Sequence, residues 1–223
     1  MKRCDDLGIK GLKLIQDDEL FCFGTDSVLL SDFAKAKQGD VVVDLCSGNG
    51  IIPVLMSAKT KAEKFYAVEL QKCSYELCRE NIELNKLDKK IEAINADIKD
   101  VLSFFRQGSV DVVTCNPPYM NKGAGFLNPE DSLAIARHEI KTNLKGVIDA
   151  AASILKFGGK FFMVHRADRL CDIISFMRDK NIEPKRIAFI QASPEKEPKL
   201  ILVEGMYGAK PSLKFEKTIY VNI

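Results

Sequence analysis

Apolar segments of strand length alternate with segments of helix length along most of this 223-residue chain. The clearest is 41–45 (Val-Val-Val-Asp-Leu), whose consecutive β-branched residues indicate a strand buried on both faces, as in a parallel sheet. Seven such strands are expected, at 41–45, 64–70, 91–95, 110–115, 160–165, 185–191 and 200–204. The alternation predicts a doubly wound α/β fold. The last two strands have no helix-length segment between them, so we expect them to pair antiparallel.

The whole chain, 1–223, is expected to form one domain. Residues 1–38 form an N-terminal extension, with a hairpin from strands at 12–16 and 20–23 and a helix from Ser27 to about Ala36, capped by Thr25-Asp26. Residues 39–205 form the core, and residues 206–223 form a C-terminal tail.

Cysteine spacing and hydropathy exclude several kinds of protein. The seven cysteines are odd in number and scattered singly, which indicates free thiols in a reducing compartment and no metal site. The N-terminus lacks the apolar stretch of a signal peptide, and no apolar run approaches the roughly 18 residues of a membrane span. We therefore expect a cytoplasmic protein without membrane contact, as a monomer or weak dimer.

A glycine-containing loop follows the first core strand, as Asp44-Leu45-Cys46-Ser47-Gly48-Asn49-Gly50. Glycines permit a tight turn and close approach of the backbone to a ligand, although an ordinary strand-to-helix turn is an equal alternative. Glu69 ends the next strand, 19 residues beyond Gly50. An acidic residue at that spacing is typical of ribose binding.

The tetrapeptide 116–119, Asn-Pro-Pro-Tyr, directly follows the strand 110–115. Proline has no backbone donor, so the carbonyl groups here remain available as acceptors. The side-chain oxygen of Asn116 and the carbonyl of Pro117 are placed to accept both hydrogens of one planar amino group, and Tyr119 to stack on the ring that bears it. A proline turn that merely ends the strand is the less specific alternative.

The charges in this region favour a cationic ligand. Pro53 occupies the place of the third glycine in a dinucleotide-binding loop, which disfavours a nicotinamide oxidoreductase, and no P-loop lysine is present. Asp44 would repel a pyrophosphate but suits an ammonium or sulfonium group. S-adenosylmethionine carries both cations and a ribose and has no phosphate.

These features together resemble the class I S-adenosylmethionine-dependent methyltransferases, in the subgroup whose Asn-Pro-Pro-Tyr-type motif methylates planar amino nitrogens. The resemblance covers about residues 20–205 and implies a Rossmann-like, mostly parallel seven-stranded sheet with helices on both faces and an antiparallel last strand. It implies that Asn116, Pro117 and Tyr119 act in catalysis. The cofactor contacts that it implies are Asp44, Gly48 and Gly50 at the methionine moiety, Glu69 at the ribose, Asp97 and Ile98 at the adenine, and Asn116. Cys46 departs from the pattern, because the family usually has glycine there.

A closer resemblance is to the bacterial tRNA1(Val) (adenine-37-N6)-methyltransferases. It rests on the segment 21–30 (Phe-Cys-Phe-Gly-Thr-Asp-Ser-Val-Leu-Leu), the loop 44–53, the tetrapeptide 116–119, and Val203-Glu204-Gly205 with a Lys/Pro-containing tail. It implies methylation of an adenine amine in tRNA next to the anticodon, and it places Thr25 and Asp26 at the methionine end of the cofactor. Methylation of a protein glutamine amide or of another nucleic-acid amine stays open, as does a methyltransferase-like RNA-binding module without activity.

The charge balance is compatible with RNA only as a local surface. The net charge is +2, but residues 1–119 carry 16 basic and 19 acidic residues, a net −3, and residues 120–223 carry 17 and 12, a net +5. Basic residues after the tetrapeptide are candidates to contact RNA phosphates, although solvated surface charge is the alternative for each: Lys122, Arg137, His138, Lys141 and Lys145. A buried structural role is expected for His165.

Overall fold

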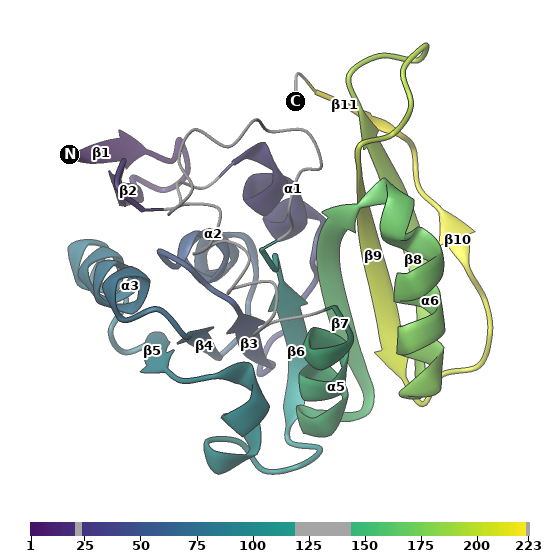
Figure 1. Cartoon of the computed structure of the whole chain (residues 1–223). Helices are drawn as coiled ribbons and strands as arrows, with labels where there is room; N and C mark the ends of the chain where they lie inside the picture. Colours follow the sequence, from purple (N-terminus) through teal and green to yellow (C-terminus); the bar gives the residue numbers. More distant parts are fainter. Residues whose placement is uncertain (21–23, 119–143, 222–223) are drawn as a thin grey trace, which may run out of the picture.

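A computed structural model of the chain describes residues 1–20, 24–118 and 144–221, and its centre is a nine-stranded sheet (Figure 1). The strand order is β10-β8-β9-β7-β6-β3-β4-β5, with β11 also pairing with β8. The strands of this sheet are β3 (Val41–Leu45), β4 (Lys64–Glu69), β5 (Ile91–Asn95), β6 (Val110–Cys115), β7 (Leu155–Arg166), β8 (Ile182–Gln191), β9 (Leu200–Tyr207), β10 (Lys214–Phe215) and β11 (Ile219–Tyr220).

Only β9 runs against its neighbours in this sheet. It pairs antiparallel with β7 and with β8, whereas the pairings of β3, β4, β5 and β6 are parallel. The predicted seven-stranded core with an antiparallel last strand is therefore confirmed. β10 and β11 add short parallel pairings to the edge strand β8, so part of the segment expected as a tail extends the sheet.

Helices cover both faces of the sheet and divide its core into two clusters (Figure 1). Residues of α1, α2 and α3 pack on one face, and residues of η1, α5 and α6 pack on the other. These elements are α1 (Thr25–Phe33), α2 (Ile51–Lys59), α3 (Lys72–Leu84), η1 (Ile98–Ser103), α5 (Leu144–Ile154) and α6 (Leu170–Asp179), with a short turn η2 (Ala167–Arg169) before α6. Burial on both faces explains the continuous apolar runs of the central strands.

The N-terminal hairpin differs from the predicted one. β1 (Lys2–Asp6) pairs antiparallel with β2 (Lys13–Asp17), so the predicted strand at 12–16 exists but has an earlier partner. Residues 21–23 of the expected second strand lie outside the described residues. Asn81 of α3 fastens the hairpin, because its side chain accepts from the N–H of Ile15 at 2.6 Å and donates to the carbonyl of Ile15 at 3.0 Å.

The start of α1 also differs from the prediction. Thr25 is already helical, and Gly24 is the residue that precedes the helix, so Thr25-Asp26 does not cap it from outside. Asp26 Oδ1 instead accepts from the neighbouring N–H of Ser27 at 2.8 Å, within the first turn. An acidic side chain in the first turn of a helix is favourable to the helix dipole.

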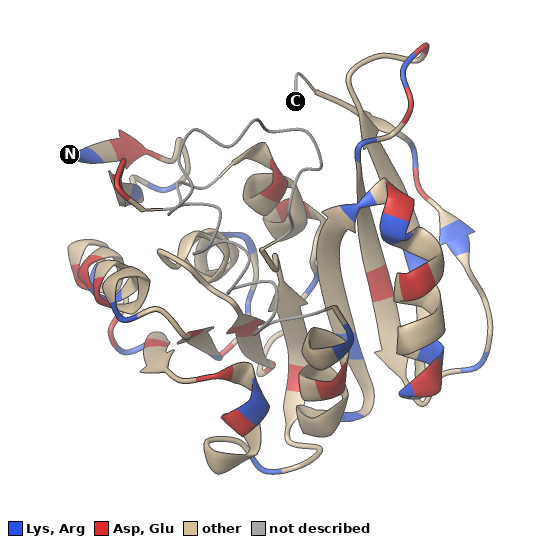
Figure 2. Ribbon diagram, in the orientation of Figure 1, with Lys and Arg blue, Asp and Glu red and all other residues tan. Residues whose placement is uncertain are grey.

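Acidic and basic residues both occur on α3, α5 and α6, so these three helices carry mixed charge (Figure 2). Several of these charges pair within one helix, as Lys145 does with Asp149 at 2.9 Å and Arg79 with Glu83 at 3.4 Å. The net +5 of the second half of the chain therefore does not form a basic face on these helices. None of the described helices has the length and apolar character needed to cross a bilayer.

Candidate functional site

Four neighbouring strands end at one edge of the sheet, which brings together the polar residues singled out from the sequence. In the register of β3, Leu45 lies opposite Val68 of β4 and Cys115 of β6, and Glu69 lies opposite Asn95 of β5. Carboxyl ends of parallel strands are where open α/β sheets bind their ligands. The residues that gather at this edge are Asp44, Glu69, Asp97 and Asn116.

The loop between β3 and α2 depends on three residues with positive φ. Gly48 and Gly50 have φ values of +57° and +84°, and Cys46 has +57°. A Cβ on Gly48 would meet no atom within 4 Å, whereas one on Gly50 would lie 2.6 Å from the Sγ of Cys78. Cys46 thus adopts the left-handed backbone of the glycine that it replaces, at a cost of roughly 1–2 kcal/mol.

Asp44 is buried, and both of its carboxylate oxygens are held by hydroxyl groups. Ser47 Oγ donates to Oδ2 and Thr114 Oγ1 donates to Oδ1, each at 2.6 Å. Burial raises the pKa of Asp44 to about 7, and the nearby carboxylate of Glu69 acts in the same direction. A buried acid that is only partly ionised near neutral pH would gain from a positive ligand beside it.

Glu69 braces the glycine loop from the next strand. Its Oε2 accepts from the N–H of Gly48 at 2.8 Å, and its Oε1 accepts from the N–H of Gln71 at 2.8 Å. A carboxylate oxygen can accept a second hydrogen bond, so both oxygens keep capacity for hydroxyl groups of a ligand. Glu69 therefore holds the glycine loop in place and can still accept hydrogen bonds from a ligand.

Asp97 caps the 3-10 helix η1. Its Oδ1 accepts from the N–H of Lys99 at 3.0 Å, and the side chain of Ile98 is packed in the core, 4% exposed. Asp97 lies two residues beyond Asn95, the last residue of β5. Asn95 Nδ2 donates to the backbone carbonyl of Glu69 at 2.8 Å, which joins the ends of β4 and β5. Asp97 is thus the N-cap of η1, and one of its two carboxylate oxygens accepts the capping hydrogen bond.

Asn116 follows β6 and is held by the first turn of α1. Its Nδ2 donates to Ser27 Oγ at 2.9 Å and to Asp26 Oδ2 at 3.2 Å. Both amide hydrogens are engaged, so the carbonyl oxygen is the part of this side chain suited to accept from a ligand. Pro117, the next residue, is buried.

Comparisons with known proteins show which proteins this chain is similar to. A family profile described as the TRM5/TYW2 methyltransferase domain matches residues 32–139. Two proteins named tRNA1(Val) (adenine(37)-N6)-methyltransferase are 30% identical to this chain. The alignment with the Shewanella sp. (strain MR-4) protein covers 64% of this chain and 61% of the relative, and that with the Haemophilus influenzae (strain 86-028NP) protein covers 70% and 66%.

Solved structures confirm the fold. An Agrobacterium tumefaciens protein described as a predicted O-methyltransferase superposes with a TM-score of 0.70 at 20% identity, covering 87% of this chain and 86% of that one. Methanocaldococcus jannaschii Trm5, solved with adenosine, superposes with a TM-score of 0.63 at 19% identity, covering 94% and 57%.

The chain has the fold of the class I methyltransferases.

The carboxyl edge of the sheet suits S-adenosylmethionine. Asp44 and Glu69 place two carboxylates beside the glycine loop, which favours a cation and disfavours a phosphate. Gly48 leaves open space at its backbone, and Asn49 Nδ2, in the same loop, is buried without a hydrogen-bond partner among the described residues. These features match a cationic ligand with polar groups that contacts the loop closely.

The described part of the chain does not place every predicted residue at the site. Lys145, on α5, forms an ion pair with Asp149 of the same helix. Those that lie outside the described residues are Tyr119, Lys122, Arg137, His138 and Lys141. The expectation for His165 holds, since it is buried at 5% exposure and its Nδ1 accepts from the N–H of Arg166 at 2.9 Å.

Sequence reasoning missed the residues that hold the site from behind. Ser27 accepts a hydrogen bond from Asn116, and Thr114 donates one to Asp44. Asn81 donates to the carbonyl of Asn49 in the glycine loop at 3.0 Å. Ser27 follows Thr25-Asp26 directly and Thr114 lies within a strand, so neither forms a motif of its own. The signal that could have found them is a polar residue on an otherwise buried element, because such a residue needs a partner.

Proposed function

We propose that this methyltransferase transfers the methyl group of S-adenosylmethionine to the exocyclic amino nitrogen of an adenine in tRNA, next to the anticodon. The observation that carries the proposal is the fixed amide of Asn116, whose Nδ2 is bound by Ser27 and Asp26 at the edge that also holds Glu69 and the glycine loop. An acceptor oxygen held at that place suits a planar amine.

Specific residues would hold the cofactor. Glu69 would bind the ribose hydroxyls through the second acceptor position of each oxygen, and Asp97 and Ile98 would border the adenine. The methionine end would lie among the loop and the first turn of α1, a region that contributes Asp44, Gly48, Gly50, Thr25 and Asp26. Asp26 and Asn116 are joined by a hydrogen bond, so the cofactor and target sites would share a wall.

The cofactor supplies an electrophilic methyl group on a sulfonium. An adenine amine is a poor nucleophile because its lone pair is delocalised into the ring. Asn116 Oδ1 and the Pro117 carbonyl would accept its two hydrogens, which favours a pyramidal nitrogen and turns the lone pair out of the ring plane. These hydrogen bonds strengthen as positive charge develops on nitrogen, so they stabilise the transition state more than the ground state. Tyr119 would stack on the base and hold the amine in line.

The substrate class is supported by the names of the relatives and by the nature of the target. The two relatives described above, and one from Porphyromonas gingivalis (strain ATCC 33277) that is 25% identical over 81% of this chain and 72% of its own length, share the name tRNA1(Val) (adenine(37)-N6)-methyltransferase. This chain spans 61% of the length of the Shewanella relative. An adenine in an RNA loop can be splayed out, which meets the need to expose its amine.

The test is methyl transfer from radiolabelled S-adenosylmethionine to unmodified tRNA1(Val) transcript, followed by nucleoside mass spectrometry. We expect label in N6-methyladenine. Label in a protein from an added cell extract, with none in RNA, would instead identify the amide-methylating alternative and overturn the proposal.

A variant tests the role of Asn116 separately. We expect Asn116→Ala to lower kcat at least about 100-fold, as loss of a transition-state acceptor does, while calorimetry shows cofactor affinity within a few-fold of the parent. Asn181→Gly is the matched control, because Asn181 is exposed at the opposite edge and has a φ of +58° that glycine accepts. Full turnover by Asn116→Ala would refute the assigned role.

A further inference from the structure

Two asparagines of α3, about one helical turn apart, bind the same strand of the N-terminal hairpin. Asn85 Oδ1 accepts from the N–H of Lys13 at 2.9 Å, and Asn85 Nδ2 donates to the carbonyl of Lys13 at 2.7 Å. Asn81 binds both backbone groups of Ile15 in the same way. Because β2 pairs with β1 along one edge only, the two side-chain amides take the place of a further strand along its other edge.

Asn81 differs from Asn85 in its third hydrogen bond, which reaches the glycine loop. Asn81 Nδ2 also donates to the carbonyl of Asn49 at 3.0 Å. The third bond of Asn85 stays within α3, where its Nδ2 donates to the backbone carbonyl of Asn81 at 2.7 Å. Asn81 is 0% exposed, so water does not compete for its bonds. One buried amide therefore joins the hairpin, α3 and the loop between β3 and α2.

The peptide that Asn81 holds lies where the backbone of the loop is least restricted by its own sequence. Asn49 stands between Gly48 and Gly50, which both have positive φ, and glycine can adopt many other backbone conformations. The N–H of Gly50 donates to the carbonyl of Ser47 at 2.9 Å, and the carbonyl of the same peptide accepts from Asn81. Both polar groups of this peptide are therefore held by the protein itself.

The glycine loop is thus supported from two separate elements. Glu69 of β4 accepts from the N–H of Gly48, and Asn81 of α3 donates to the carbonyl of Asn49. A ligand binds more tightly to a loop that already has its bound shape, because less conformational freedom is lost on binding. Removal of a buried hydrogen-bond partner is costly, so a loop without Asn81 should shift until that carbonyl finds another donor.

We infer that Asn81 is a positioning residue for the cofactor and that it couples the N-terminal hairpin to the affinity for S-adenosylmethionine. The inference rests on the proposed placement of the cofactor at the glycine loop. Such coupling is reciprocal, so bound cofactor must in turn stabilise the contact of Asn81 with Ile15. The described structure gives Asn85 no bond to the loop, so Asn85 serves the hairpin alone.

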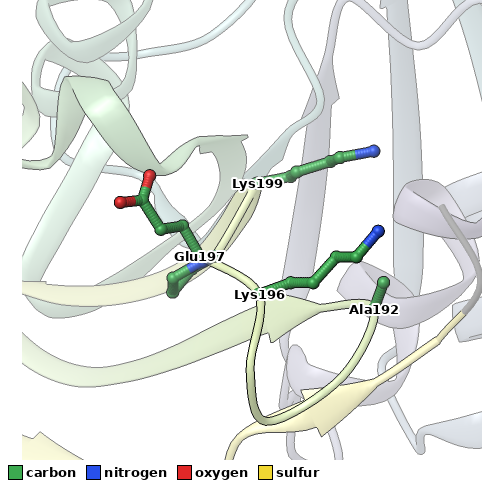
Figure 3. A pocket seen from close by; sticks show the side chains of 5 residues that line it. Ala192, Lys196, Glu197 and Lys199 are labelled. Carbon is green, nitrogen blue, oxygen red and sulfur yellow. The ribbon is translucent and has the colours of Figure 1, made fainter.

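Calorimetry with S-adenosylmethionine measures the first half of this coupling. The variants are Asn81→Ala and its matched control Asn85→Ala, which each remove three side-chain hydrogen bonds, two of them to β2. Lys196→Ala is the reference for a substitution remote from the hairpin, because Lys196 lies in the loop between β8 and β9 (Figure 3). We expect Asn81→Ala to weaken cofactor binding about 10-fold, and the other two variants to stay within about twofold of the parent.

Amide hydrogen exchange of the parent, followed by NMR, measures the second half and does not depend on the folding of a variant. The N–H of Ile15 is bound to Asn81 and the N–H of Lys13 to Asn85, so the two amides report on neighbouring contacts of one strand. We expect saturating S-adenosylmethionine to slow exchange at Ile15 at least about threefold more than at Lys13.

Equal cofactor affinities of Asn81→Ala and Asn85→Ala would overturn the inference. If Asn81→Ala does not fold, equal slowing of exchange at Ile15 and Lys13 would overturn it instead. Neither measurement uses RNA, so a parent that shows the coupling but transfers no methyl group to tRNA supports the inference while the proposed reaction fails. A parent that does not bind S-adenosylmethionine overturns both.

Discussion

Ser27 Oγ accepts a 2.9 Å hydrogen bond from Asn116 Nδ2, and this bond joins the first turn of α1 to the end of β6 across 89 residues of sequence. Ser27 is 3% exposed, so the bond is shielded from water. The bond fixes the orientation of the Asn116 amide. Without it, rotation of the side chain could present either the amide nitrogen or the amide oxygen to the target. Ser27 is accordingly a positioning residue.

Ser27→Ala is expected to lower kcat about 10- to 100-fold, because Asn116 Oδ1 is no longer held in line with the target amine. KM for the cofactor should change little. Ser27→Thr keeps the hydroxyl and should recover most of the rate, which steady-state kinetics of both variants will measure. A parallel loss of kcat and thermal stability without rescue by threonine would mean that Ser27 serves only the packing of α1.

Cys46→Gly is expected to stabilise the protein by about 0.5–1 kcal/mol. The change relieves the left-handed backbone of a non-glycine residue, and the greater freedom of glycine in the unfolded chain offsets part of that gain. Cys46→Ala is the control, because it removes the thiol that contacts Cys115 but keeps the strained backbone. Chemical denaturation will compare them, and equal stability of the two variants would contradict the role given to φ.

Cofactor affinity should depend on the ionisation of Asp44. The pKa of this buried acid is about 7, so at pH 6 roughly one molecule in ten has the carboxylate that attracts a cation. Binding should therefore strengthen about tenfold from pH 6 to pH 8, with release of a proton, and level off above the pKa. Asp44→Asn is the control, because titration of the cofactor itself affects the parent and the variant equally. The ratio of parent to variant cofactor affinity, measured by calorimetry at each pH, therefore isolates the effect of Asp44. A ratio that does not change with pH would count against this role.

His165 should make the folded state less stable in mild acid. Burial lowers its pKa from 6.5 to about 4, so below pH 6.5 the unfolded chain binds a proton that the folded chain does not. The stabilising contribution of the neutral ring to the free energy of unfolding is fully present above pH 6.5. It falls as the pH drops toward 4, and about 2 kcal/mol of it is lost at pH 5. Asp44 acts in the opposite sense, because its raised pKa makes the folded state bind a proton between pH 3.8 and 7.

His165→Asn separates the effect of His165 on stability from that of Asp44. Asparagine does not titrate, and it keeps an acceptor for the N–H of Arg166. The difference in unfolding free energy between parent and variant, measured by denaturant at pH 5 and pH 7, should move by about 2 kcal/mol in favour of the variant at the lower pH. A difference that does not change with pH would show that folding leaves the pKa of His165 unchanged and would contradict this prediction.

The succession of strands and helices along the chain followed from local patterns, as did the polar residues expected at the carboxyl ends of the strands. Valine-rich runs, a loop with two glycines and a tetrapeptide after β6 all act over a few residues, so they are legible in one dimension. The hairpin partner of β2 was not predicted, because four of the five residues in Lys2–Asp6 are charged and resemble an exposed coil. Pairing with β2 and an ion pair between Lys2 and Glu80 of α3 stabilise this strand in the fold. Thr25-Asp26 was predicted to cap α1 but lies in its first turn, because these residue types suit both positions in the local sequence.

What the sequence determined by itself is therefore the doubly wound sheet and which polar residues lie at its carboxyl edge, since periodicity and motif spacing are local properties. Only the tertiary structure decided how that chemistry is oriented. Ser27 reaches Asn116, Thr114 reaches Asp44, and Glu69 reaches Gly48 across 21 to 89 residues of chain. A buried donor or acceptor takes whichever partner the fold brings within about 3 Å, and that choice is made by packing in three dimensions.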